Sequence, residues 1–71
     1  MAVKKLKQLE VAISAHRSGN IQKAESLYKE VLIARPDDPD ANHNLGVIEV
    51  SREHYREAIT LFEKLLEAIL T

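Results

Sequence analysis

The sequence predicts an all-α fold, an α-solenoid built from two stacked helix-turn-helix hairpins with four helices in total. Two observations predict it. The pattern of apolar residues occurs twice at a fixed distance, and within each copy the apolar residues follow the three- and four-residue spacing of a helix. A period between about 20 and 50 residues is typical of stacked units, each of which needs a neighbour to cover its apolar face.

A shift of 34 positions places the first half of the chain on the second half. Because the shift matches both helices of each hairpin, we expect a single domain over residues 1–71, with a first repeat at about 5–38 and a second at about 39–71. The matched pairs keep their apolar character: Val11 with Leu45, Ala12 with Gly46, Ile13 with Val47, Ile21 with Tyr55, Ala24 with Ala58, Leu27 with Leu61, Tyr28 with Phe62, Val31 with Leu65, and Leu32 with Leu66.

The first hairpin is predicted from two helical patterns on either side of a short turn. Apolar residues at helical spacing predict helices over about 2–18 and 21–34. Between them, Gly19 can adopt the left-handed conformation that ends a helix, and Asn20 can cap the helix that follows.

The second hairpin follows the one clear break in the chain. Pro36 disfavours continuation of the preceding helix, and Asp38 followed by Pro39 is typical of an N-cap and the first residue of a new helix. Helices are predicted over about 39–52 and 55–70, joined by a turn.

Composition excludes several classes of protein. The chain has 71 residues, of which 45% are hydrophobic and 30% charged, with a formal net charge of -1 and no cysteine. A near-neutral chain gives no electrostatic basis for binding nucleic acid, and without cysteine there is no disulfide or thiolate metal site. No apolar run approaches the roughly 20 residues of a membrane span. We therefore expect a cytoplasmic protein with neither a nucleic-acid nor a membrane partner.

Paired helices in units of this length, with small and large residues at these offsets, resemble the tetratricopeptide repeat. The sequence departs from the family pattern at several positions. Gln8 and Asn42 stand where a large aromatic residue is expected, and Ala15 and Glu49 where a tyrosine is expected. In the second repeat, Glu53 replaces the turn glycine and Leu70 the closing proline. The residues that match the pattern are Val11, Ala12, Ala24, Tyr28 and Pro36 in the first repeat and Leu45, Gly46, Ala58 and Phe62 in the second.

The small residues of this pattern have a physical reason. A glycine inside a helix costs about 1 kcal/mol relative to alanine, so we expect two helices to approach closely at Gly46. Ala12 occupies the same position in the first repeat, while Tyr28 and Phe62 are expected to fill the space toward the next unit.

The resemblance implies a concave surface, lined by the first helix of each hairpin, that binds an extended peptide or a helix of a protein partner. Its apolar part suits the apolar face of a helix, or else a second copy of the chain covers it. One branch of the family binds the C-terminal carboxylate of a peptide on this surface. We do not expect this chain to do so, because Asn44 alone matches the residues that hold the carboxylate there. The groove residues carried over by register are Leu6, Leu9, Ile13, His16 and Arg17 in the first repeat and Asp40, His43, Asn44, Val47, Val50 and Ser51 in the second.

The last predicted helix carries apolar residues that no following repeat covers. Either the chain is an excised or engineered piece of a longer array, or two chains meet through these faces as a homo-oligomer. The residues assigned to self-association are Phe62, Leu65, Leu66, Ile69 and Leu70.

No pattern in the sequence predicts catalysis. His16, His43 and His54 do not share the i, i+4 spacing of a metal site on one helix, and no nucleophile has a base and an orienting group near it in the sequence. We expect no metal and no cofactor. The sequence predicts a non-enzymatic scaffold or adaptor module; the alternatives are a regulatory or carrier fragment of a larger enzyme and an engineered self-assembling repeat.

Overall fold

The computed structural model describes the backbone of residues 2–70 and the side chains of residues 7–70. Within this range the chain forms four α-helices and no strand: α1 (Ala2–Arg17), α2 (Ile21–Ala34), α3 (Pro39–Ser51) and α4 (Tyr55–Leu70). The all-α prediction is confirmed, and each predicted helix boundary agrees with the structure to within one residue.

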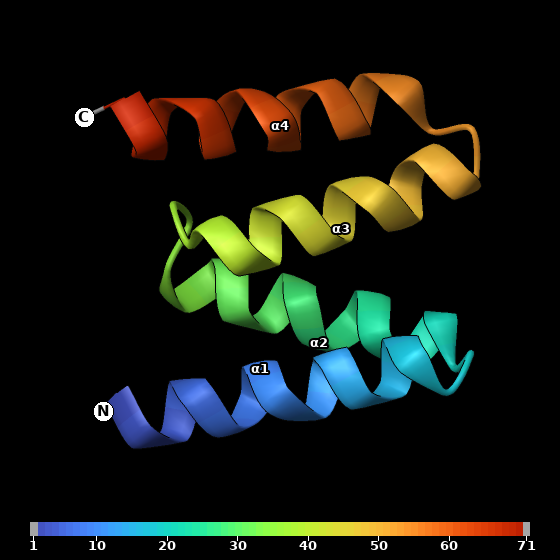
Figure 1. The fold of residues 1–71 in the computed structure, drawn as a ribbon, viewed down its shortest axis with the longest axis vertical. Helices are drawn as coiled ribbons and strands as arrows, with labels where there is room; N and C mark the ends of the chain where they lie inside the picture. Colours follow the sequence, from blue (N-terminus) through green and yellow to red (C-terminus); the bar gives the residue numbers. More distant parts are fainter. Residues whose placement is uncertain (1, 71) are drawn as a thin grey trace.

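The four helices lie in a row in the order of the sequence, and each runs in the direction opposite to that of its neighbour (Figure 1). The close contacts are between consecutive helices, α1 with α2, α2 with α3 and α3 with α4. Helices α1 and α4 therefore lie at the two ends of the row. No helix in the described part of the chain is long and apolar enough to span a membrane.

Both turns within the hairpins place a residue in the left-handed region. Gly19 has a φ of 85° between α1 and α2, and Glu53 has a φ of 63° between α3 and α4. Glu53 thus adopts the conformation for which the family pattern has glycine, at a steric cost that glycine avoids. Asn20 is the N-cap residue of α2 but its side chain makes no capping hydrogen bond.

The start of α3 is fixed by its own sequence. The Asp38 side chain is buried and accepts a hydrogen bond from the backbone N–H of Ala41 at 3.0 Å, and Pro39 takes the first helical position. The fully buried Asn42 side chain adds a second contact, because its Nδ2 donates to the carbonyl oxygens of Pro36 and Asp38, each at 3.0 Å. Asn42 therefore stabilises the connection between the two hairpins.

The core lies between neighbouring helices and depends on small residues where helices cross. A Cβ atom added to Gly46 would lie 2.5 Å from Cε1 of Phe62, so the close approach expected at this glycine is confirmed. Ala12, the counterpart of Gly46 in the first repeat, is fully buried. The buried apolar cluster consists of Leu9, Ala12, Ala15, Ala24, Tyr28, Val31, Ala41, Leu45 and Ile48.

We expect Gly46→Ala to lower the free energy of unfolding by about 1–2 kcal/mol, because crowding against Phe62 costs more than the roughly 1 kcal/mol of helix propensity gained. In a Phe62→Ala background the same substitution should instead stabilise the protein by about 1 kcal/mol. Urea unfolding of the four variants at one protein concentration measures this coupling. An equal effect of Gly46→Ala in both backgrounds would contradict the close contact.

Replacing Asn42 tests the connection between the hairpins. We expect Asn42→Ala to cost about 1–3 kcal/mol, since the carbonyl oxygen of Pro36 loses its side-chain donor and that of Asp38 keeps only the backbone N–H of residue 42. Asn42→Asp should cost more near pH 7, where a carboxylate faces the two carbonyl oxygens, and the additional loss should shrink below about pH 4 as the carboxyl group gains a proton and can donate. Urea unfolding at both pH values measures the difference, with the exposed Asn20→Asp as the control.

Candidate partner-binding surfaces

A pocket opens between α1 and α3 and is lined also by Tyr28 of α2. The Tyr28 side chain is buried, and its hydroxyl oxygen lies 3.4 Å from Nδ1 of His16, with the two rings edge to face at 6.0 Å. The Asn44 side chain also hydrogen-bonds to Tyr28. Ile13 and Arg17 complete the lining, so the pocket combines an apolar wall, a cation and groups able to donate and accept hydrogen bonds.

Burial raises the pKa of the Tyr28 hydroxyl, because the phenolate is poorly solvated between three helices. The hydrogen bond from Asn44 opposes this shift and the negative charge of Asp40 adds to it. The hydroxyl is therefore neutral at physiological pH and can take part in hydrogen bonds as a donor.

The predicted groove residues do not all lie on an open surface. Ile13, His16 and Asn44 meet at the pocket, while His43, Val47 and Val50 are exposed on α3. We treat the surface formed by these six residues as a candidate binding groove, and we call this set the groove.

Leu9 was expected in the groove but belongs to the core, where it is 5% exposed and lies in the same buried cluster as Ala12 and Val31. A leucine in this register packs onto the neighbouring helix, whereas His43, its counterpart in the second repeat, stays exposed. Leu6, the first expected groove residue, lies outside the described side chains.

Helix α4 carries a second candidate surface. We call it the α4 stripe, and its members are separated by alternating steps of four and three residues along one side of the helix: Tyr55, Ile59, Phe62, Leu66 and Ile69. Ile59 and Leu66 are each more than half exposed, and Ile69 is 68% exposed. Phe62 and the adjacent Leu65 are half-buried, and Leu70 is exposed beside the stripe.

The same positions in α2 show what covers such a stripe inside the chain. Tyr28 and Val31 are fully buried, whereas their counterparts Phe62 and Leu65 are only half-buried. Helix α3 packs against α2, and no described helix packs in that place against α4. The side-chain surface that is buried in the first repeat and exposed in the second is therefore surface that one more helix would cover.

Sequence reasoning missed three residues of these surfaces. Tyr28 was assigned only to the core, although a hydroxyl on an otherwise apolar stripe indicates a polar neighbour. Tyr55 and Ile59 were not assigned to self-association, although they extend the same spacing toward the start of α4.

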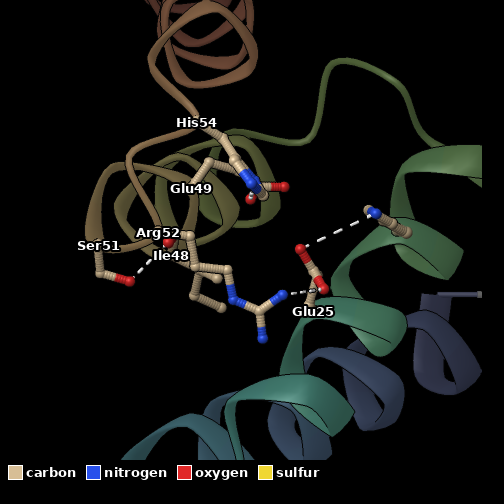
Figure 2. A network of polar contacts seen from close by, with 7 residues as sticks. Glu25, Ile48, Glu49, Ser51, Arg52 and His54 are labelled. Carbon is tan, nitrogen blue, oxygen red and sulfur yellow. Dashed lines mark hydrogen bonds and ion pairs between the residues drawn. The ribbon is translucent and has the colours of Figure 1, made fainter.

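A polar network lies where α3 turns into α4. Figure 2 shows Arg52 reaching across to α2, where its Nη1 donates to Oε1 of Glu25 at 2.8 Å. Nδ1 of His54 lies 3.0 Å from Oε1 of the buried Glu49. These contacts tie the two repeats and the turn together. Among the described side chains, no three His, Asp or Glu residues lie close enough together to hold a metal ion.

The helix pairs, their repeat and the small residues at the crossings agree with a comparison with known families. A family model described as tetratricopeptide repeat matches residues 15–69, which is more than half of the chain. The chain belongs to the tetratricopeptide repeat family. No curated protein and no solved structure gives a significant match. Tetratricopeptide repeats form protein-interaction modules.

The buried Tyr28 hydroxyl should make stability sensitive to alkaline pH. Because its pKa is raised in the folded state, the stability it contributes is present below the unfolded pKa of about 10 and is lost as pH rises above that value. We expect Tyr28→Phe to cost about 1 kcal/mol at pH 7 and to decline less than the wild type between pH 9 and 11. Urea unfolding across this range measures the decline, and exposed Tyr55→Phe should decline as the wild type does.

Proposed function

We propose that this chain is a non-enzymatic protein–protein interaction module, a scaffold or adaptor, that self-associates through the α4 stripe. The observation that carries the proposal is the exposure of Ile59, Leu66 and Ile69 along one side of α4, whereas Glu25 and Leu32, the first-repeat counterparts of Ile59 and Leu66, are partly buried. Fully burying one such side chain contributes about 1.5–3 kcal/mol, so a continuous stripe of them favours association.

The groove is the proposed site for a different protein partner. Val47 and Val50 offer exposed apolar surface for a helix, and His43 and Asn44 can hydrogen-bond to a peptide backbone. The pocket beside them adds the Tyr28 hydroxyl and the Arg17 cation. The groove and the α4 stripe adjoin where the His43 ring lies 6.4 Å from the Phe62 ring, and we propose that each binds its own partner, which is the property of an adaptor.

Sedimentation equilibrium over a wide range of protein concentration, with helicity followed by circular dichroism, tests the proposal. We expect the wild type to be larger than a monomer and Leu66→Glu to weaken association by about 100-fold, because the glutamate would place a charge in an apolar contact. Ile33→Glu is the matched control, since Ile33 is 82% exposed on α2 outside the stripe. A helical monomer at every wild-type concentration would overturn self-association.

The same measurement separates the two surfaces. Val47→Glu alters the groove and should leave the molar mass unchanged, because Val47 lies on α3 outside the α4 stripe. If Val47→Glu dissociates the assembly as Leu66→Glu does, then the second copy covers the groove as well and the groove is not free for another partner.

A further inference from the structure

Building on the proposed self-association, we propose its geometry: the α4 helices of two copies pair antiparallel about a two-fold axis. The product is a closed dimer, not a head-to-tail filament that continues the row of helices. The occupant of the α4 stripe is thus the α4 stripe of a second copy. Three features of the described residues carry this inference.

The first feature is the spacing of the α4 stripe. Its members follow the steps of four, three, four and three residues that put side chains along one seam between paired helices. Inside the chain, α2 packs against α3, which runs in the opposite direction, and Tyr28, the α2 counterpart of Phe62, is fully buried (Figure 1). A helix is therefore the shape that fits the stripe.

The second feature is the charge beside the seam. Arg56 and Glu63 are exposed and lie seven residues apart on the flank of the stripe that faces away from Ala58, the residue of α4 buried against the core. Side chains at such flanking positions pair across a two-helix contact and select its orientation. An antiparallel partner brings Arg56 of each copy to the Glu63 of the other copy, which makes the pair twice.

The charges also select one register. If Phe62 faces the Ile59 of the other copy, Tyr55 faces its Leu66 and the two Arg56–Glu63 pairs form. Moving the partner by one heptad sets the two Glu63 side chains against each other, which like-charge repulsion disfavours. In the favoured register, Ile69 extends past the first turn of the other α4, toward the residues that join it to α3.

The third feature is that the outer side of α1 fits poorly against the α4 stripe of another copy, as head-to-tail stacking would require. On α3 the residues covered by α2 include Ala41, Leu45 and Ile48, all fully or nearly fully buried. Their counterparts on the outer side of α1 are Lys7, Val11 and Ser14, all exposed. A stacked α1 would thus place a lysine and a serine against the α4 stripe.

The salt bridge between repeats is lost in a stacked arrangement as well. Within the chain, Arg52 and Glu25 pair at 2.8 Å. In a head-to-tail contact their counterparts are Ser18 of one copy and Ile59 of the other, which cannot form a salt bridge. The apolar α4 stripe has a better partner in its own copy.

Charge exchange tests the orientation. We expect Arg56→Glu and Glu63→Arg each to weaken the dimer by about tenfold in sedimentation equilibrium, and the double variant to return to within about threefold of the wild type. Both side chains are exposed, so monomer helicity serves as the folding control. Single variants without effect, or a double variant weaker than both singles, would overturn the antiparallel pairing.

Disulfide trapping gives an independent measurement, because the chain has no cysteine of its own. In the proposed register, a Tyr55→Cys chain mixed with a Leu66→Cys chain should form a mixed disulfide, and neither variant should cross-link efficiently with itself. Efficient self-linking of Tyr55→Cys would show parallel α4 helices, and linking of Leu66→Cys to Val11→Cys would show head-to-tail stacking. Either result would overturn the inference.

The outcomes keep the two proposals apart. A molar mass that rises without limit, together with the Val11–Leu66 link, would leave self-association standing and overturn only the closed dimer. A monomer at all concentrations would overturn self-association itself, and the antiparallel pairing with it. A dimer that is restored by the double charge variant and that forms only the Tyr55–Leu66 link supports both.

Discussion

The structure depends on one constraint: a two-helix hairpin cannot cover both sides of its second helix. In the first repeat α3 supplies the missing cover, and Tyr28 and Val31 of α2 are fully buried as a result. In the second repeat the described chain supplies no such helix, so Phe62 and Leu65 stay half-buried. The same sequence pattern therefore produces a core in one repeat and a binding surface in the other.

The α4 stripe and the groove differ in chemistry, and each suits a different kind of partner. The α4 stripe is apolar along the length of the helix and has charges only on its flank, which suits a contact that excludes water. The groove mixes valines with imidazole and amide groups, and Tyr28 adds a phenol in the adjoining pocket, which suits a partner with its own backbone groups to satisfy. The two surfaces adjoin where His43 of α3 lies beside Phe62 of α4, with ring centroids 6.4 Å apart.

The helices could be predicted from the sequence because local signals agreed with the repeat. Gly19 and the Asp38–Pro39 pair mark boundaries by their backbone preferences alone, and the close contact at Gly46 follows from the cost of glycine in a helix. Burial could not be predicted in the same way. Leu9 and His43 share one register, yet only Leu9 is buried, because register gives the direction of a side chain and not the extent of its cover.

The order of the helices in space is also their order in the chain, and each packs closely only against the next one. Contacts between segments so near in sequence require little loop-closure entropy, which favours rapid folding that can begin in either hairpin. Stability is then distributed along the row of helices, and the close contacts of the described part of α1 are those with α2. Helix α1 can accordingly unfold while the three helices that carry the α4 stripe and its support remain packed, so backbone amides of α1 are opened to solvent exchange independently of the rest.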